Sequence, residues 1–295
     1  MSTEAARCSV LAVVGAGSMG AQIAQQAALH GVEVRLQDIS PEQLGRAAGS
    51  NRSLLERRAA KGRLQSPELE AALARVSTTT ELPAAVEGAE VVVEAIVEQL
   101  DAKRRLFADL DRLAAPDALL ASNSSTMGVS ELVAGIEHPE RCCNLHFFYP
   151  PLVMDLVEVV KGPQTSEEAV ERGMSFVRQI GRTPVLLRKE IPGFIVNRIL
   201  QMATQEAYRL LDAGVASFED IDTAVEKGLR WPLGPFRLGD LTGLDTTYNA
   251  RKHMLEITGD ERFRPSSALE AKVRAGELGR KTGRGWYVYS REQDD

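Results

Sequence analysis

The sequence predicts an α/β fold in which a doubly wound parallel sheet is followed by a smaller, all-helical domain. Short apolar runs alternate with helical patterns in the first part of the 295 residues, as in sheets covered by helices on both faces. After Glu190-Ile191-Pro192-Gly193 the pattern is helical only. This change of character predicts one domain over residues 1–188 and a second over residues 189–295.

Apolar segments of strand length carry the predicted sheet. They are Ser9–Val14, Val32–Gln37, Val76–Thr78, Glu90–Glu94, Leu119–Ser122, Cys143–Phe147, Leu156–Val160 and Val185–Leu187. A helix over Ser166–Gln179 is predicted to have Ser166 as its N-cap. In the second domain, helical patterns cover Phe194–Gly214, Ser217–Gly228 and Thr246–Thr258, and Ser217 with Asp220 resembles a capping box.

A charged segment, Pro41–Ala74, is longer than an ordinary connection between neighbouring strands. Its helical periodicity predicts a pair of helices that extends from the sheet. Its basic side chains are Arg52, Arg57, Arg58, Lys61 and Arg63. They form either a face that meets a phosphorylated substrate or an ordinary solvated surface.

Composition excludes several classes of partner. The chain is 44% hydrophobic and 26% charged, which is ordinary for a globular protein, and no apolar run is long enough to suggest a membrane span. The residues Met1–Arg7 lack the apolar core of a signal peptide. A formal charge of −6 gives no general attraction to nucleic acid or acidic membranes. We expect a cytoplasmic protein that binds neither.

The cysteines form no disulfide framework. Cys8, Cys142 and Cys143 are the only ones in the chain. Cys142 and His146 are four apart and share a face of a strand, but nothing nearby supplies further metal ligands. We therefore predict no metal site and interpret the cysteines as small core residues.

A glycine motif near the amino terminus predicts a nucleotide site. Val10–Val14 runs into Gly15-Ala16-Gly17-Ser18-Met19-Gly20 and then into a helical pattern, the order of a dinucleotide-binding βαβ unit. Gly15 permits the tight turn, Gly17 lets the backbone approach a pyrophosphate, and Gly20 allows close helix–strand packing. The anion meets the N–H groups at the start of the helix, so Ser18 and Met19 are also predicted to contact the cofactor.

Asp38 supplies the second part of this site, because it ends the next strand at about the expected 20-residue offset. Its carboxylate would accept hydrogen bonds from both ribose hydroxyls and repel a 2′-phosphate. The sequence therefore favours NAD over NADP. The alternative is a glycine turn followed by an aspartate that merely caps a helix.

Two polar residues interrupt apolar strands. His146 lies in Asn144-Leu145-His146-Phe147-Phe148, and Glu158 lies in Leu156–Val160. The turn signal Tyr149-Pro150-Pro151 between them would let two short strands bring the imidazole and the carboxylate together. A histidine held by a carboxylate suits a general base that removes the proton of a secondary alcohol. Alternatively, His146 is a hydrogen-bonded core residue and Glu158 an edge-strand charge.

The chain resembles the 3-hydroxyacyl-CoA dehydrogenase family from Val10 to about Tyr289. Besides the glycine motif, the matching segments are Val93-Glu94-Ala95-Ile96-Val97-Glu98, Ser122-Asn123-Ser124-Ser125, Leu145-His146-Phe147-Phe148, Pro192-Gly193-Phe194-Ile195-Val196-Asn197-Arg198, Gly234-Pro235-Phe236, Gly243-Leu244-Asp245 and Lys281-Thr282-Gly283-Arg284-Gly285. This resemblance implies an NAD-dependent enzyme with the α/β domain that binds dinucleotides, known as the Rossmann fold, followed by a helical domain.

The resemblance implies catalytic roles for particular residues. His146 is the implied catalytic base, with Glu158 as its orienting partner. Ser125 and Asn197 are implied to contact the reacting oxygens of the substrate, with Ser125 also near the nicotinamide. Outside the family context, the preferred interpretation is that Ser125 and Asn197 are helix caps.

Further implied contacts involve cofactor and substrate. Glu98, Lys103 and Lys281 are implied to contact the cofactor. Ser53 and Lys61 fall near positions where the family binds the CoA moiety. Without the resemblance, Lys103 would be interpreted as a helix-surface charge paired with Glu98 or Asp109.

One segment departs from the family. The family continues from its histidine as Phe-x-Asn-Pro, whereas this chain has Phe147-Phe148-Tyr149-Pro150. Tyr149 is larger than the family asparagine, lacks a carboxamide and offers one hydroxyl at a greater reach. Either other groups hold the cofactor, or the pocket is reshaped for a different acyl chain. The departure therefore concerns the substrate more than the chemistry.

We therefore predict reversible NAD-dependent oxidation of an L-3-hydroxyacyl-CoA, 3-hydroxybutyryl-CoA or longer, to the 3-ketoacyl-CoA. One alternative is a related dehydrogenase of a carrier-protein-tethered or free hydroxy acid, and another is a non-catalytic NAD-binding protein. The helix over Ile195–Leu211 is more apolar than one buried face requires. We expect it to support a homodimer, unless it is the buried central helix of a monomer.

Overall fold

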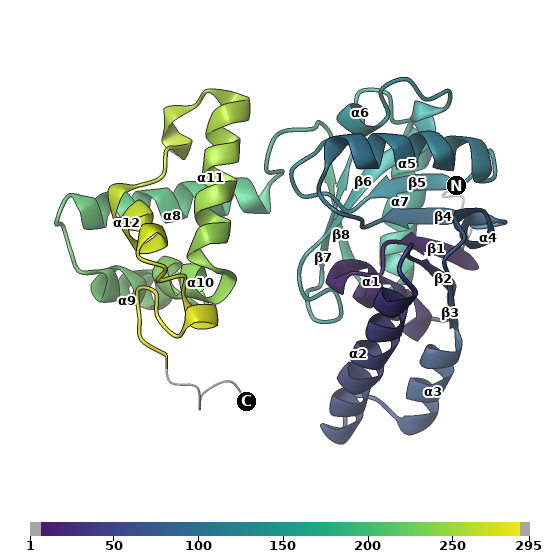
Figure 1. The fold of residues 1–295 in the computed structure, drawn as a ribbon, viewed down its shortest axis with the longest axis horizontal. Coiled ribbons are helices and arrows are strands. Elements are labelled where there is room, and N and C mark those ends of the chain that lie inside the picture. Colours follow the sequence, from purple (N-terminus) through teal and green to yellow (C-terminus); the bar gives the residue numbers. More distant parts are fainter. Residues whose placement is uncertain (1–6, 290–295) are drawn as a thin grey trace. The chain divides into compact units, whose positions relative to one another are not determined.

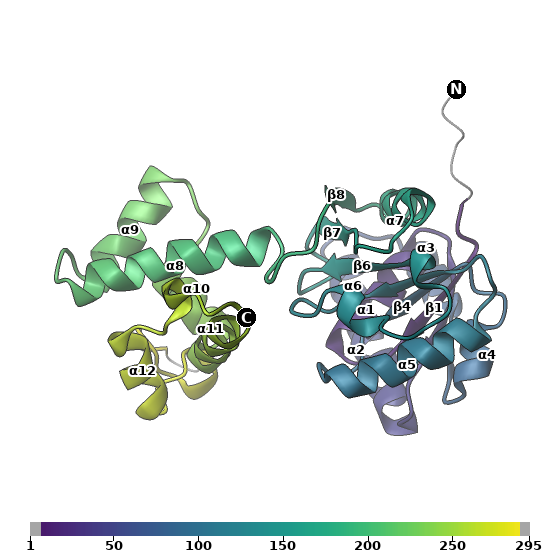
Figure 2. The ribbon, with the colours of Figure 1, turned by 90° about the horizontal axis from the view of Figure 1, so that it is seen from above.

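The computed structural model describes residues 7–289, which divide into two compact units between Phe194 and Ile195. The first unit contains the sheet and the second is helical, so the predicted fold class is confirmed (Figures 1 and 2). Within the described range, no helix is both long and apolar enough to cross a bilayer.

One sheet of eight strands organises the first unit, in the order β3-β2-β1-β4-β5-β6-β7-β8. The strands are β1 (Val10–Val14), β2 (Glu33–Gln37), β3 (Val76–Thr79), β4 (Val91–Glu94), β5 (Leu119–Ser122), β6 (Cys142–Phe147), β7 (Leu156–Val160) and β8 (Thr183–Leu187). From β3 through β6, neighbouring strands are parallel. The chain order along the sheet reverses between β1 and β4, where doubly wound sheets bind ligands.

The prediction of a parallel sheet is wrong for its last two strands. β7 pairs with β6 in antiparallel register, and β8 runs parallel to β7. Residues 148–155, which connect β6 to β7, contain no helix. A parallel return needs a crossover of about a dozen or more residues, so the shorter connection reverses the chain.

Helices cover both faces of the sheet. α1 (Ser18–Leu29) and α7 (Glu167–Gln179) pack on one face. α4 (Leu82–Val86), α5 (Leu100–Leu113) and α6 (Val129–Leu132) pack on the other. Alternate side chains of β1 supply the two cores, as the two-residue period of a strand requires.

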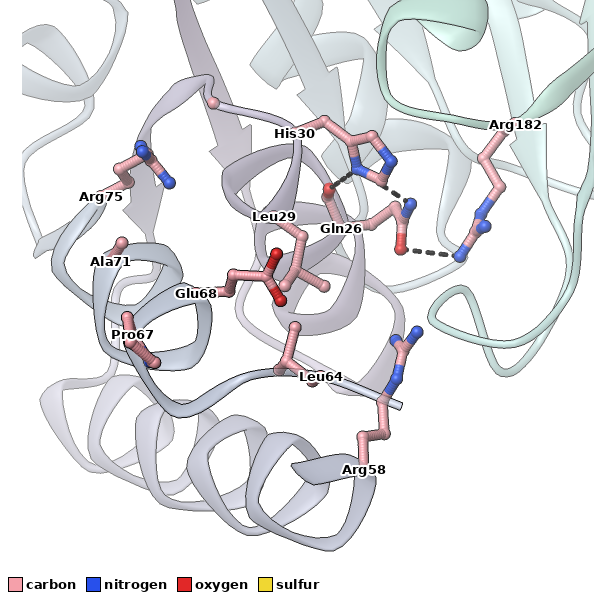
Figure 3. Close-up of a pocket in the computed structure, with 11 residues that line it drawn as sticks. Gln26, Leu29, His30, Arg58, Leu64, Pro67, Glu68, Ala71, Arg75 and Arg182 are labelled. Carbon is pink, nitrogen blue, oxygen red and sulfur yellow. Dashed lines mark hydrogen bonds between the residues drawn. The ribbon is translucent and has the colours of Figure 1, made fainter. Parts of the chain in front are cut away.

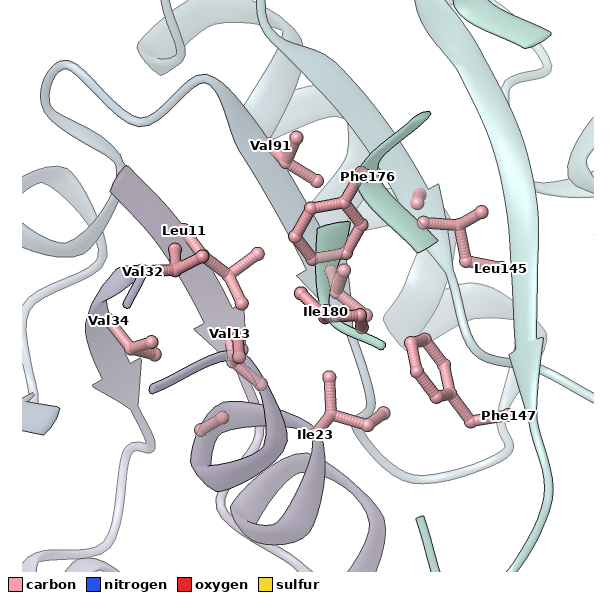
Figure 4. Close-up of a cluster of buried hydrophobic side chains, with 14 of the residues drawn as sticks. Leu11, Val13, Ile23, Val32, Val34, Val91, Leu145, Phe147, Phe176 and Ile180 are labelled. Atoms are coloured by element: carbon pink, nitrogen blue, oxygen red, sulfur yellow. The ribbon is translucent and has the colours of Figure 1, made fainter. Parts of the chain in front are cut away.

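The first of these cores is drawn in Figure 4, where side chains of β1, α1 and α7 meet. Leu11 and Val13 point into it with Ile23 and Phe176, whereas Ala12 and Val14 belong to the opposite core. Both cores include side chains of β1, the strand that ends at the glycine turn. The turn therefore begins from a strand that is packed on both faces.

The predicted helical pair is confirmed as α2 (Pro41–Ala60) and α3 (Ser66–Ala74), which extend from the sheet (Figure 1). Ser40 caps α2 by accepting a hydrogen bond from the Gln43 N–H at 3.2 Å. Leu55, Leu69 and Ala72 form a small core of their own. This core holds the pair together outside the sheet.

The second unit contains α8 (Val196–Asp212), α9 (Phe218–Gly228), α10 (Pro235–Thr242), α11 (Leu244–Thr258) and α12 (Ser267–Arg274). Its core is aromatic, with Tyr208, Phe236 and Trp286 in mutual contact. Half of the predicted capping box forms: Ser217 Oγ accepts from the Asp220 N–H at 3.1 Å and donates to the Asp220 carboxylate. The three cysteines are buried in the first unit.

Candidate active site

The glycine turn lies at the carboxyl end of β1, and each glycine has a distinct role there. Gly15 has φ +103°, and a Cβ on it would lie 2.5 Å from the Ala95 carbonyl oxygen. A Cβ on Gly20 would lie 1.9 Å from the Gly15 carbonyl oxygen. A Cβ on Gly17, which caps α1, would meet nothing within 4 Å. The space beside Gly17 is therefore open, and a ligand can approach the protein backbone there.

Asp38 lies directly after β2 and closes this turn. Its Oδ2 accepts a hydrogen bond from the Ala16 N–H at 2.8 Å, and its Oδ1 accepts from the Ser40 N–H at 2.9 Å. Each carboxylate oxygen keeps a second acceptor site. The next residue, Ile39, is 90% exposed, and sequence reasoning missed it. An apolar side chain exposed to solvent beside Asp38 is suited to contact with a flat aromatic ring.

The second part of the site lies across β6 and β7, where the antiparallel register places His146 opposite Glu158. His146 Nδ1 lies 2.7 Å from Glu158 Oε2. The histidine is 4% exposed and the glutamate is fully buried. A carboxylate only accepts, so Nδ1 carries the proton and the lone pair of a neutral ring is on Nε2.

Two aromatic rings hold the imidazole in place. The Phe148 ring centroid is 4.5 Å from that of His146, and the Phe194 centroid is 5.4 Å from it. Phe194 is buried with Val160 and Leu187, and its φ of +47° is unusual for a bulky residue. Packing and the Glu158 hydrogen bond together restrict the ring to one orientation.

Ser125 lies in the loop after β5, and its neighbours fix that loop. Asn144 in β6 accepts from the Val129 N–H at 2.8 Å and donates to the Met127 carbonyl at 3.0 Å. Ser124 Oγ accepts from the Met127 N–H at 2.9 Å. The half-buried Ser125 hydroxyl has no hydrogen-bond partner among residues 7–289. Its donor and acceptor therefore remain available to a ligand.

A buried ionic network follows β4. Lys103, 1% exposed, contacts Glu94 and lies 3.1 Å from Glu98 Oε2. Glu94 is fully buried and also accepts from Ser122 Oγ at 2.7 Å and from the Ile96 N–H at 2.8 Å. Lys103 is therefore not the surface charge of the alternative interpretation. Sequence reasoning missed Glu94, although a carboxylate that ends the apolar strand Val91–Glu94 was the available signal.

Glu98 is the exposed end of this network. Burial alone would raise its pKa, but hydrogen bonds from Ser124 and Thr126 and the charge of Lys103 outweigh burial and lower the pKa of Glu98. The carboxylate is therefore ionised near neutral pH. It lies in the loop after β4, at the same carboxyl edge of the sheet as the glycine turn.

The comparisons with known proteins match this architecture over nearly the whole chain. The model described as "3-hydroxyacyl-CoA dehydrogenase, NAD binding domain" matches residues 10–191, and the C-terminal domain of the same family matches residues 193–289. The chain belongs to the 3-hydroxyacyl-CoA dehydrogenase family. It is accordingly an NAD-dependent oxidoreductase, as the resemblance implied.

Individual relatives of this family member agree. A probable 3-hydroxybutyryl-CoA dehydrogenase of Bacillus subtilis is 39% identical over 277 residues, covering 94% of this chain and 96% of the relative. The crystal structure of 3-hydroxybutyryl-CoA dehydrogenase from Escherichia coli K12 has a TM-score of 0.93 at 38% identity, covering 98% of this chain and 61% of that chain. The crystal structure of (S)-3-hydroxybutyryl-CoA dehydrogenase from Ralstonia eutropha has a TM-score of 0.91 at 36% identity, covering 96% of this chain and 100% of that chain.

The first unit of this family member fits NAD. The open space at Gly17, the start of α1 and the spare acceptors of Asp38 match the pyrophosphate and the adenosine ribose. Ser18 and Met19 form the first turn of that helix.

The other predicted site residues lie outside the sheet, on the helical pair, in the connection after β6 and in the second unit. Ser53 on α2 and Lys61 at its C-cap are exposed. Asn197 lies in the first turn of α8, and Lys281 lies in the second unit 2.5 Å from Asp245 Oδ1. A hydrogen bond from Lys281 lowers the pKa of Asp245. Tyr149 is 64% exposed.

Proposed function

We propose that this protein oxidises the 3-hydroxyl of an (S)-3-hydroxyacyl-CoA to the ketone, reversibly, with NAD as acceptor. The observation that carries the proposal is the buried His146–Glu158 pair, because a binding protein has no use for an oriented proton acceptor. The family membership and the named relatives support the substrate class.

The protein's own part in this reaction is proton transfer. His146 Nε2 takes the hydroxyl proton, and the ring becomes positively charged. Glu158 stabilises that charge through Nδ1–H, and it keeps the lone pair of the neutral ring on Nε2. When bound, NAD would supply the acceptor for the hydride that leaves C3 of the substrate. In the reverse direction the imidazolium returns the proton to the ketone oxygen.

Other residues are proposed to position the reactants. Ser125 and Asn197 are compact donors suited to polarise the reacting oxygen. Glu98, held by Lys103, and Lys281 are proposed to contact the cofactor. We infer that the buried Lys103 acts on NAD by fixing Glu98, since its ammonium is already paired with two carboxylates.

The CoA moiety is proposed to contact α2. Ser53 and Lys61 are both exposed, and a lysine ammonium is a suitable charge for a phosphate. We propose 3-hydroxybutyryl-CoA or a longer 3-hydroxyacyl-CoA as substrate. Tyr149 replaces the family asparagine and is the residue that we expect to modify acyl preference.

The test is an NADH absorbance assay with 3-hydroxybutyryl-CoA, a longer 3-hydroxyacyl-CoA and the corresponding free acids. We expect turnover of a CoA thioester and a kcat/KM at least about tenfold lower for the free acids. A preference for the free acids would favour the alternative dehydrogenase. His146→Gln should lower kcat by about 10²–10⁴-fold while NAD binding, measured by calorimetry, persists.

A matched control separates the base from histidines in general. His138 is a surface histidine 3.4 Å from Glu140, with a side chain that is 52% exposed. His138→Gln should retain the kcat of the unmodified protein. Full activity in His146→Gln, or equal losses in both variants, would contradict the proposed mechanism.

We also propose that the protein is a homodimer through its second unit. Ile199 on α8 is 61% exposed, and Ile195, the residue that precedes the first residue of α8, is 37% exposed. Light scattering coupled to size-exclusion chromatography measures the mass directly, and a monomer at micromolar concentration would contradict this proposal. The cytoplasmic location expected from the sequence stays a prediction.

A further inference from the structure

A pocket of about 620 Å³ lies beside the helical pair, and the proposed reaction does not use it. It is lined by α1, α2, α3 and the residues before β8 (Figure 3). Neither Ser53 nor Lys61, the proposed CoA contacts, lines it. Its size falls within the range of about 300–1,000 Å³ that is usual for small-molecule sites.

Two arginines on one side of this pocket are held close together by neighbouring carbonyls. Arg182 donates to the Pro151 carbonyl at 2.8 Å and to Gln26 Oε1 at 2.7 Å. Arg58 donates to the next carbonyl along the chain, that of Leu152, at 3.4 Å. In Figure 3 the guanidinium groups of Arg58 and Arg182 lie on the same side of the pocket.

Neither guanidinium is neutralised by the protein. Within residues 7–289, no carboxylate lies within 4.0 Å of Arg58 or Arg182. Both side chains are half-buried. Burial lowers the pKa of Arg182, and repulsion from Arg58 lowers it further. The charge of Asp155 acts in the opposite direction and raises this pKa, but burial outweighs it. Two partly desolvated like charges held together are stabilised when an anion lies between them.

The rest of the pocket indicates the kind of anion. Arg75 adds a third guanidinium, which donates to the Ala28 carbonyl at 3.2 Å. Glu68 is the carboxylate in the lining, and its Oε2 already accepts from the Gln65 N–H at 2.9 Å. Leu29 and Leu64 supply an apolar surface between the charged groups. An organic ion with a phosphoryl group and an apolar or aromatic body matches this distribution.

We propose that this pocket binds an organic phosphate, with its phosphoryl oxygens between Arg58 and Arg182 and its body against Leu29 and Leu64. Arg58 makes one hydrogen bond to the described residues and so keeps the planar fork that can donate two parallel hydrogen bonds to a phosphoryl group. Arg182 already donates to Pro151, Gln26 and Gly181, so it contributes mainly its charge. The phosphoryl group has two sources, a free nucleotide or the nucleotide portion of CoA. The chemistry that the pocket recognises is the same for both.

Calorimetry on the full chain tests the proposal without requiring turnover, so its failure is distinguishable from failure of the proposed function. The probes are AMP and adenosine 3′,5′-bisphosphate, the latter being the nucleotide portion of CoA. Each is titrated with NAD at saturation, so that the dinucleotide site is blocked. We expect binding of at least one probe, weakened at least tenfold in Arg58→Gln and in Arg182→Gln.

Arg46→Gln is the matched control, because Arg46 lies on the same helix, is 62% exposed and pairs with Glu42 outside the pocket. It removes the same charge and should leave the probe's Kd unchanged. If Arg182→Gln fails to fold, Arg58→Gln carries the test, since Arg58 makes a single long hydrogen bond to the described residues. Undetectable binding of both probes, or equal weakening by Arg46→Gln, would overturn the proposal.

The steady-state KM for 3-hydroxybutyryl-CoA distinguishes the sources. If the pocket takes the nucleotide portion of CoA, Arg58→Gln raises that KM in parallel with the Kd of the bisphosphate. If it takes a free nucleotide, the KM is unchanged while the Kd of AMP rises. Both results support the phosphate site and identify its occupant.

Discussion

His146 Nδ1 lies 2.7 Å from Glu158 Oε2 because two neighbouring strands place these residues at paired positions. The Glu158→Gln variant keeps an acceptor for Nδ1–H but removes the charge that stabilises the imidazolium. A hydrogen bond to a charged group contributes about 1.5–3 kcal/mol, so we expect kcat to fall by about 10–100-fold. The KM for the thioester should change much less. Steady-state kinetics measures both, and an unchanged kcat would argue against the pairing.

The glycines of the turn allow a paired prediction. Gly17 has φ −65°, which alanine adopts readily, so Gly17→Ala should fold with nearly unchanged Tm. Its methyl group would occupy the space beside the pyrophosphate and weaken NAD binding at least about tenfold. Gly20→Ala places a methyl 1.9 Å from the Gly15 carbonyl oxygen, so it should lower stability by about 1–3 kcal/mol or more.

Thermal melting and NAD titration on both variants separate these effects. The order of stabilities is the deciding result. A Gly20→Ala protein as stable as Gly17→Ala would show that the turn is not packed as the structure describes.

Asp38 is expected to set the choice of dinucleotide. Asp38→Asn removes the negative charge that disfavours a 2′-phosphate, while one oxygen remains to accept from the backbone. We expect the ratio of kcat/KM for NAD to that for NADP to fall about 10–100-fold, the equivalent of about 1.5–3 kcal/mol. Assays with both dinucleotides give the ratio. A constant ratio would mean that another group discriminates between them.

Glu98 predicts a pH dependence of stability. Its pKa is lowered in the folded protein, where Ser124, Thr126 and Lys103 stabilise the carboxylate. Its contribution to the free energy of unfolding is therefore complete above the unfolded pKa of about 4.3 and is lost as the pH falls through the folded pKa. Urea titrations of the unmodified protein and Glu98→Gln from pH 7 down to about pH 3 should converge. A difference that does not change with pH would contradict this account.

The strands were predictable to within one or two residues because each is a short apolar run bounded by turn residues. β8 begins at Thr183, two residues before its predicted start, and it includes Pro184. Proline lacks the N–H of a strand ladder, but β8 is the last strand of the sheet. An edge strand tolerates that loss.

The direction of β7 required information that periodicity does not contain. An apolar run reads the same in both directions, so the clues lay in the short connection after β6 and the turn signal within it. The pairing of His146 with Glu158 was nevertheless predictable, because the turn signal and the two polar interruptions suffice for it.

Contacts over long sequence distances explain the rest. Glu94 and Lys103 were visible as residues, but their mutual burial depends on how α5 packs against the end of β4. Asn144 appeared only as a polar residue in an apolar strand, whereas its carboxamide holds the loop that carries Ser125. α10 and α12 were missed because they are short, at eight residues each.

Phe194 links the proposed catalytic histidine to the boundary between the two units. Its ring lies against the imidazole, and the peptide bond that follows it leads directly into the helical unit. An insertion before Phe194 would shift its ring away from His146 as well as lengthen the connection between the two units. An inserted spacer or a hinge substitution must therefore begin after Phe194 if the proton acceptor is to keep its geometry.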